Sequence, residues 1–241
     1  MTRTDLCARI EELGIVPVIR AGSASLAMNA VEALVSGGIS VVEITMTVPN
    51  AVAVISAVAA RFGGSVLIGA GTITSADEAR RAVGAGAQFV VSPGLHLDVV
   101  EAAQALDVPV MPGVLTPTEI MAATRAGADW VKIFPCSALG GPAYLRALRG
   151  PFPHVKMMPT GGVSLTNASE YIDAGAAALG VGAELVDPTL LEAGRYESVR
   201  ERALTFVTIV RRARSKALAS DITQSSGQDP AALTPTPARG L

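Results

Sequence analysis

Four glycines recur at nearly regular intervals and constrain the fold of this 241-residue chain more than any other feature. Gly38, Gly86, Gly127 and Gly175 are 48, 41 and 48 residues apart, and each lies between an Ala-rich stretch and a β-branched or apolar run. Glycine in this setting is typical of the end of a helix, where the backbone turns left-handed. Each interval is long enough for two strand–helix units, so the spacing indicates a fourfold repeat of such pairs.

Eight short apolar runs alternate with helical stretches over the first 182 residues. This alternation predicts a parallel sheet with crossover helices, and eight units in one chain predict a single (β/α)8 TIM barrel of the α/β class. Two capping boxes, Ser75-x-x-Glu78 and Thr116-x-x-Glu119, mark helix starts. The predicted strands are 15–20, 40–46, 65–70, 88–92, 108–111, 129–134, 154–159 and 177–182.

The composition changes towards the C-terminal end. We expect the barrel domain to span residues 1–215. Residues 216–241 are rich in Ser, Thr, Pro, Gln and Ala without hydrophobic periodicity. This pattern is typical of a disordered tail.

Composition also argues against several classes of function. The net charge of -2 provides no basic surface for nucleic acid, and the longest apolar stretch, 51–60, is too short to span a membrane. No signal-peptide pattern is present, and two cysteines are too few for a disulfide framework, so we expect a reducing, cytoplasmic setting. Two histidines and no cluster with ligand spacing argue against a structural or catalytic metal.

A lysine inside a predicted strand is the strongest chemical signal. Lys132 lies in Asp129-Trp130-Val131-Lys132-Ile133-Phe134-Pro135, and lysine is rarely buried without compensation. Desolvation favours the neutral amine, which is the nucleophile that Schiff-base chemistry on a carbonyl requires. Lys156, near the start of the next strand, is expected at the opposite end of the barrel, in solvent.

The glycine repeat gives a register for this lysine. Five residues beyond the four glycines lie Glu43, Val91, Lys132 and Gly180. In a (β/α)8 barrel, alternate strands contribute the four side chains of one interior layer. Glu43 and Lys132 are therefore expected to point into the same central space, where Gly180 leaves room for a ligand.

Polar residues close the neighbouring strands. Glu43, Thr45 and Thr47 share one face of their strand, and Arg20 ends the preceding strand. A polar inner face near the carboxyl ends of the strands is where barrel enzymes build their active sites. We expect Trp130 and Phe134, which flank Lys132 on its own face, to shield the amine from water.

Glycine-rich turns follow the last two predicted strands. Thr160-Gly161-Gly162 ends one strand, and Gly180-Val181-Gly182-Ala183 ends the other. Backbone N–H groups in such turns can surround an anion, and this is the recurrent phosphate position of (β/α)8 barrels. The alternative is that both turns are merely tight corners between a strand and a helix.

Together these residues resemble the family of 2-keto-3-deoxy-6-phosphogluconate (KDPG) aldolases, which also includes 4-hydroxy-2-oxoglutarate (KHG) aldolases. The resemblance covers nearly all of the chain except the tail, and its order and spacing match throughout. The segments that carry it are VPVIR (16–20), VVEITMTVPNA (41–51), IGAGTITS (68–75), FVVSPGL (89–95), MPGVLTPTE (111–119), DWVKIFP (129–135), GPFPHVKMMPTGGV (150–163) and LGVGAELV (179–186).

The resemblance implies a class I lyase that needs no metal or cofactor and is usually a homotrimer. It implies that Lys132 forms the Schiff base and that Glu43 is the general acid and base. Thr72 and Thr160 would line the pyruvyl pocket with Pro93 and Phe134 as apolar walls. Gly161, Gly162, Gly182 and Ala183 would form the phosphate-binding turns. The implied reaction cleaves KDPG to pyruvate and glyceraldehyde 3-phosphate.

Two positions depart from the common pattern of the family. Many members carry an arginine at the position of Thr47 to hold the substrate carboxylate, whereas a subgroup carries threonine there and an arginine at the position of Arg20. This chain resembles the subgroup, so Arg20 is expected to supply that charge. Ala183 stands where a serine hydroxyl is common at the phosphate site, which removes a hydrogen bond of about 1.5–3 kcal/mol to a charged group.

Several alternatives remain open from the sequence. Within the lyases, the substrate could be 4-hydroxy-2-oxoglutarate or 2-keto-3-deoxy-6-phosphogalactonate (KDPGal), because the stereochemistry at C4 cannot be read from residues. A phosphosugar isomerase or epimerase would share the barrel and the phosphate turns, but it would not need Lys132. A non-catalytic binder of sugar-acid phosphates is a third class, which the presence of both Lys132 and Glu43 disfavours.

Overall fold

The strands form a closed parallel barrel, as the sequence predicts. A computed structural model describes the backbone of residues 1–225 and the side chains of residues 1–216. One run of paired strands has the order β5-β4-β3-β2-β1-β9, and a second has the order β6-β7-β8. The strands are β1 (Ile15–Ile19), β2 (Val41–Thr45), β3 (Leu67–Gly71), β4 (Phe89–Val91), β5 (Val110–Met111), β6 (Gly113–Val114), β7 (Val131–Ile133), β8 (Met157–Pro159) and β9 (Leu179–Val181).

The two runs of strands join at both ends. A parallel bridge between Thr160 and Gly180 connects β8 to β9. On the other side, β5 lies within the predicted fifth strand, 108–111, and β6 extends it beyond that prediction, on the far side of Pro112. Proline has no N–H to give to a sheet ladder, which explains the interruption. The carbonyl of Pro112 still accepts a hydrogen bond from the amide of Lys132 at 2.9 Å, so the wall of the barrel is continuous here.

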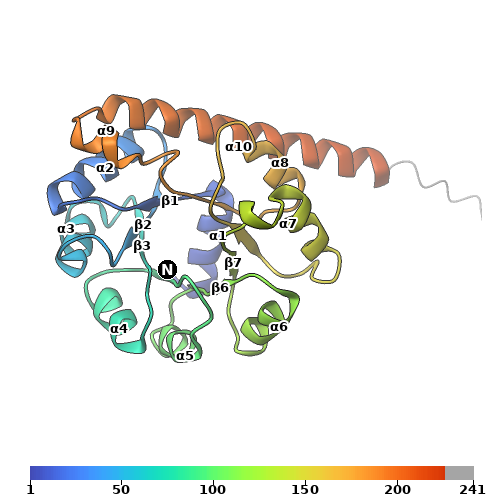
Figure 1. The fold of residues 1–241 in the computed structure, drawn as a ribbon, viewed down its shortest axis with the longest axis horizontal. Coiled ribbons are helices and arrows are strands. Elements are labelled where there is room, and N and C mark those ends of the chain that lie inside the picture. The colour runs from blue at the N-terminus through green and yellow to red at the C-terminus, as the bar shows by residue number, and fades with distance from the viewer. Residues whose placement is uncertain (226–241) are drawn as a thin grey trace, which may run out of the picture.

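The helices form a ring round the strands, and the last helix runs along one side of the barrel and extends past it (Figure 1). Most of the helices connect successive strands, as a (β/α)8 barrel requires. They are α1 (Arg3–Leu13), α2 (Ala24–Ser36), α3 (Ala51–Phe62), α4 (Ala76–Gly84), α5 (Leu97–Ala105), α6 (Pro117–Arg125), α7 (Pro142–Arg149), α8 (Ala168–Asp173), α9 (Pro188–Glu192) and α10 (Tyr196–Ser225), with a 3-10 turn at Ser137–Leu139.

The N-terminal helix α1 closes the end of the barrel where the strands begin. Its Leu6, Cys7 and Ile10 pack in one cluster with interior residues of the strands, including Val16 and Trp130. Because apolar side chains fill this end, a ligand can reach the interior only from the end where the strands terminate.

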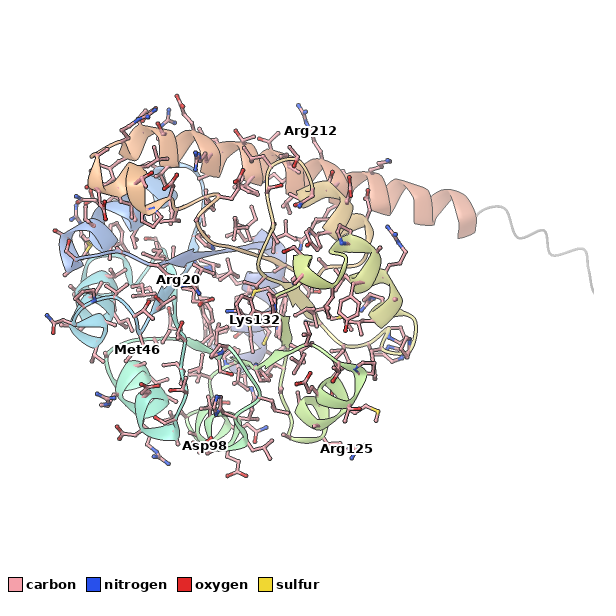
Figure 2. All side chains as sticks on the ribbon, viewed as in Figure 1. Arg20, Met46, Asp98, Arg125, Lys132 and Arg212 are labelled. Carbon is pink, nitrogen blue, oxygen red and sulfur yellow. The ribbon has the colours of Figure 1, made fainter. Side chains whose placement is uncertain are left out.

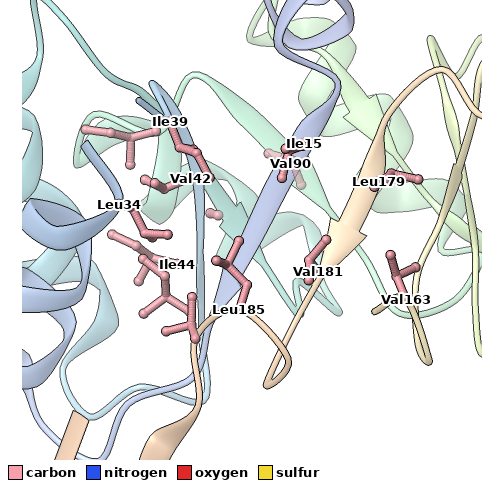
Figure 3. Packing of buried hydrophobic residues seen from close by; sticks show 14 of the residues in the cluster. Ile15, Leu34, Ile39, Val42, Ile44, Val90, Val163, Leu179, Val181 and Leu185 are labelled. Atoms are coloured by element: carbon pink, nitrogen blue, oxygen red, sulfur yellow. The ribbon is translucent and has the colours of Figure 1, made fainter. Parts of the chain in front are cut away.

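Side chains on each strand alternate between the barrel interior and the helices. On β2, Val41 belongs to the interior cluster, whereas Val42 and Ile44 belong to the larger cluster between strands and helices. Figure 3 shows Val42 and Ile44 beside Leu34 of α2. This alternation directs Glu43 inward, in agreement with the predicted register. The four repeat glycines adopt the predicted left-handed backbone, with φ of 85°, 111°, 81° and 92°.

Two sequence predictions need correction. The chain does not leave helical structure at residue 216, because α10 continues to Ser225. Residues 216–224 contain helix formers such as Ala, Leu, Lys and Gln and lack Gly and Pro, so nothing in them ends the helix. The remainder of the predicted tail, 226–241, lies outside the described residues. Lys156 is not simply solvated, since its Nζ lies 2.6 Å from a carboxylate oxygen of Glu11 and 5.5 Å from the ring centre of Trp130.

Candidate active site

Glu43 and Lys132 meet inside the barrel. Lys132 Nζ lies 4.0 Å from Glu43 Oε1, and the two side chains are 3% and 0% exposed. Glu43 comes from β2 and Lys132 from β7, so strands far apart in the sequence bring an acid and an amine together. The predicted shared layer is therefore present, and Lys132 is fully buried instead of reaching solvent.

The Glu43 carboxylate has no hydrogen bond to any other described residue, at either oxygen. A buried carboxylate without hydrogen bonds is costly, and such groups are concentrated at functional sites. Gly71 makes room for this carboxylate, because a Cβ built on Gly71 would lie 1.9 Å from Glu43 Oε1. Glycine at this position of the neighbouring strand thus leaves space for the Glu43 carboxylate, an acid that the fold alone does not need.

One aromatic ring flanks the amine. Lys132 Nζ lies 5.3 Å from the ring centre of Phe134. Trp130 was expected beside the amine as well, but its ring lies nearer the closed end of the barrel, in the cluster with Leu6 and Ile10. Two residues along a strand correspond to about 7 Å, which separates the two rings into different layers. Among the described side chains, Phe134 therefore forms the aromatic wall on the open side of Lys132.

A cavity of about 320 Å³ opens above this layer. Its wall comes from the carboxyl ends of β1, β7, β8 and β9 and from the turns that follow them. Figure 2 shows Arg20 and Lys132 together in the central region enclosed by the ring of helices. The residues that line the cavity include seven of the predicted site residues and one adjacent acid: Arg20, Phe134, Thr160, Gly161, Gly162, Gly182, Ala183 and Glu184.

The turn after β8 has the shape of an anion site. Gly161 and Gly162 have φ of 87° and 78°, which side chains other than glycine rarely tolerate. Asn167 holds the turn, because its amide donates to the carbonyl of Gly162 at 2.8 Å while its side-chain oxygen accepts from the N–H of Ser164 at 2.8 Å. Helix α8 begins directly after Asn167, at Ala168. Asn167 has no recognisable spacing motif and was not identified from the sequence.

Arg20 faces the turn after β9. Its Nη1 lies 3.9 Å from the position that a Cβ on Gly182 would take. No hydrogen bond or ion pair ties the guanidinium to another described residue, and its side chain is exposed at the mouth. A free cation beside two glycine-rich turns makes this cavity suitable for an anionic ligand.

Three predicted site residues lie at the mouth but outside the wall of this cavity. Thr47 follows β2, and its hydroxyl contacts that of Thr45 at 2.7 Å. Thr72 follows β3 with φ of 59°, a strained conformation for a β-branched residue and one that is concentrated at functional sites. Pro93 follows β4, and its carbonyl oxygen lies close over Gly113 of β6.

Thr45 is a further site residue that sequence reasoning left unassigned. It is fully buried, and its hydroxyl donates to the carbonyl of Ile19, next to Arg20, at 3.0 Å. The only available signal was its place on the same strand face as Glu43. Among the side chains that the structure describes, no group of three or more His, Cys, Asp or Glu residues is arranged to hold a metal ion.

A barrel with a buried amine beside a carboxylate that has no hydrogen bond, under a cavity walled by glycine-rich turns, has the features of a class I aldolase site. Comparison with known proteins agrees with this class. The family model for KDPG and KHG aldolase matches residues 6–202. This chain belongs to the KDPG/KHG aldolase family and is an aldehyde-lyase.

Individual relatives cover most of the barrel. The 2-dehydro-3-deoxy-phosphogluconate aldolase of Treponema pallidum is 39% identical over 163 residues, which are 68% of this chain and 77% of that protein. A native KDPGal structure matches with a TM-score of 0.77 at 32% identity, covering 83% of this chain and 96% of that one. The KDPG aldolase of Legionella pneumophila, with pyruvate captured as a covalent carbinolamine, matches with a TM-score of 0.77 at 31% identity over 83% and 97%.

Proposed function

We propose that this protein cleaves KDPG to pyruvate and glyceraldehyde 3-phosphate through a Schiff base on Lys132. The observation that carries the proposal is the buried Lys132 at 4.0 Å from the Glu43 carboxylate, which has no hydrogen bond to another described residue. An isomerase would need the acid but no nucleophilic amine, and a passive binder would need neither.

Lys132 attacks the C2 ketone of the substrate as a neutral amine. Glu43 is close enough to exchange protons with the carbinolamine oxygen, so that water leaves and a protonated imine forms. The ring of Phe134 and the apolar interior exclude bulk water from the imine. The closed end of the barrel leaves the mouth as the route for substrate and product.

The imine then accepts the electrons of the C3–C4 bond. Glu43 removes the proton of the C4 hydroxyl, the C3–C4 bond breaks, and glyceraldehyde 3-phosphate leaves as the aldehyde. The remaining enamine takes a proton at C3, and water hydrolyses the resulting imine to release pyruvate and the free amine. Each proton transfer uses Glu43, which lies beside Lys132.

The substrate phosphate binds at the two glycine-rich turns. Gly161, Gly162 and Gly182 would provide backbone N–H groups, and Arg20 would provide the positive charge, because its guanidinium faces Gly182. This assignment differs from the role at the carboxylate that the resemblance suggests for Arg20. A charge-assisted bond from Arg20 would offset the hydroxyl that is absent at Ala183.

Trapping the imine tests the central claim. Wild-type protein is incubated with pyruvate and borohydride, and peptide mass spectrometry locates the reduced adduct. We expect the adduct on Lys132 and not on Lys156, which pairs with Glu11 at the closed end. A folded protein that forms no adduct would overturn the Schiff-base mechanism.

The choice between C4 epimers needs kinetics. KDPGal is the second candidate substrate, favoured by the similarity to the native KDPGal structure. Values of kcat/KM for KDPG, KDPGal and 4-hydroxy-2-oxoglutarate, measured with one enzyme preparation, would rank the three. We expect KDPG to rank first, and a higher value for either rival would replace it.

We also propose that the enzyme is a cytoplasmic homotrimer. The resemblance to the family implies three subunits, and the outward face of α3 suits a subunit contact. The exposed Ala53, Ser56, Ala57 and Ala60 carry no charge, and a shallow cavity of about 690 Å³ lies beside them.

Both cysteines are unpaired and buried, as is common in a reducing compartment. None of the helices within residues 1–225 is both long and apolar enough to cross a membrane.

A further inference from the structure

A short chain of hydrogen bonds connects the mouth of the barrel to the wall between β1 and β2. The hydroxyl of Thr47 lies 2.7 Å from the hydroxyl of Thr45, and the hydroxyl of Thr45 lies 3.0 Å from the carbonyl oxygen of Ile19. Thr45 is fully buried, whereas Thr47 is exposed at the mouth. Thr47 is thus held in place by a partner that water does not reach.

The direction of this chain follows from its last member. A carbonyl oxygen only accepts, so the single hydrogen of the Thr45 hydroxyl goes to Ile19. Thr45 then has only lone pairs for Thr47, and the hydrogen of the Thr47 hydroxyl must point back to Thr45. What Thr47 presents to the mouth is therefore an acceptor. An acceptor repels a carboxylate and suits a donor such as a substrate hydroxyl.

We propose that Thr47 accepts a hydrogen bond from the C5 hydroxyl of the substrate and thereby selects aldehydes that carry a hydroxyl beside the carbonyl. The inference rests on the proposed function, which places the imine carbon next to Glu43 and the phosphate at the Gly161 and Gly182 turns. Thr47 lies on the same strand face as Glu43 but nearer the mouth. The nearest part of the substrate is then the carbon chain between imine and phosphate, where the C4 hydroxyl is already engaged by Glu43.

Aldol condensation with two aldehydes tests the proposal. Glyceraldehyde 3-phosphate carries the hydroxyl that becomes C5, and 3-oxopropyl phosphate lacks it. For Thr47→Val we expect kcat/KM with glyceraldehyde 3-phosphate to fall about fivefold, the effect of one neutral hydrogen bond. The value with 3-oxopropyl phosphate should stay within about twofold, and the KM for pyruvate should not change.

Variants of Thr45 test whether Thr45 fixes the direction of the Thr47 hydrogen bond. Thr45→Val removes the group that holds the Thr47 hydrogen, so the preference for the hydroxylated aldehyde should shrink, whereas Thr45→Ser should keep it. Thr124→Val is the matched control, because Thr124 also donates to a main-chain carbonyl, that of Ile120, but on α6 outside the barrel interior. This control should preserve the preference.

Two results would overturn the proposal. A raised KM for pyruvate in Thr47→Val, with an unchanged ratio between the aldehydes, would assign Thr47 to the carboxylate. An equal loss of kcat/KM with both aldehydes would mean that Thr47 contributes only packing and no hydrogen bond to the C5 hydroxyl. Failure of the proposed function itself would look different, since wild-type protein would then form no borohydride adduct and condense neither aldehyde.

Discussion

Burying Lys132 and Glu43 together is expected to lower the stability of the fold while it makes the reaction possible. Both groups lose hydration, and at 4.0 Å their attraction is not reinforced by a direct hydrogen bond. Replacing such a pair by apolar residues is often neutral or stabilising, whereas removing one partner leaves an uncompensated charge. The cost is therefore expected in the free energy of unfolding and the benefit in the rate of reaction.

Two variants separate the effect of the pair on stability from its effect on the reaction. Lys132→Met should abolish the pyruvate adduct and lower the free energy of unfolding, because Glu43 is left buried alone. The double variant Lys132→Met with Glu43→Leu should be equally inactive but about 1–4 kcal/mol more stable than wild type. Urea unfolding followed by circular dichroism measures both. A double variant less stable than wild type would mean that the pair stabilises the fold.

The two thiols should be inert in the native enzyme. Burial raises the pKa of both Cys7 and Cys136 above the ordinary thiol value. Because the thiolate is the reactive form, neither residue should react with Ellman's reagent at pH 8 until denaturant is added. Activity should also survive iodoacetamide. Fast labelling of Cys136 in folded protein, read by peptide mass spectrometry, would contradict this expectation.

At the scale of elements, strand β3 makes room for the active-site acid because its residue Gly71 has no side chain. A Cβ on Gly71 would collide with the Glu43 carboxylate, so Gly71→Ala should displace the acid and lower kcat by about 100-fold, within the range for losing a positioned acid or base. Gly84→Ala is the control, since nothing lies within 4 Å of a Cβ there and the position is helical. It should stabilise α4 by up to about 1 kcal/mol and leave kcat unchanged.

Helix α10 is locked to α1 through one arginine. Arg214 donates to the carbonyls of Glu11 and Glu12 at the end of α1 and to that of Ala177 just before β9. Burial lowers the pKa of this guanidinium, but it remains charged at neutral pH. Arg214→Ala should therefore cost about 2–3 kcal/mol of unfolding free energy, as for hydrogen bonds to charged groups. The exposed Arg212→Ala in the same helix should change it by less than about 0.5 kcal/mol. Similar urea midpoints for Arg214→Ala and Arg212→Ala would show that the Arg214 hydrogen bonds do not hold α10 to α1.

The elements also show which features local sequence determines. The strands, the left-handed glycines and the meeting of Glu43 with Lys132 follow from a repeat and from strand alternation, which are periodic signals. The predicted fifth strand ends just before Pro112, which lacks an N–H, and the continuation of that strand at Gly113–Val114 was not predicted. The position of Arg20 beside Gly182 depends on a contact between distant segments, and the Asn167 brace has no recognisable sequence signature.

For the whole molecule, the distribution of charge on the helices is uneven. From Ala51 to Ala60, helix α3 contains only Ala, Val, Ile and Ser, and its exposed positions include Ala53, Ser56, Ala57 and Ala60. A helix that is apolar all round is normally buried. The loop before α3 contains Thr47, so a neighbouring subunit packed on α3 would also restrain the segment that selects the substrate.

A charge placed on this face tests whether it is a subunit contact. Wild-type protein should elute with the mass of three protomers when size exclusion is coupled to light scattering. Ala57→Glu should shift it to a single protomer, because a contact of small apolar side chains cannot hydrate a buried carboxylate. Ala147→Glu, the same change at an exposed alanine of α7, should leave the trimer intact. If wild-type protein is monomeric at micromolar concentration, or if both variants stay trimeric, the face of α3 is not the contact. If Ala57→Glu is monomeric and its KM for glyceraldehyde 3-phosphate rises while that for pyruvate does not, assembly acts on the loop that bears Thr47.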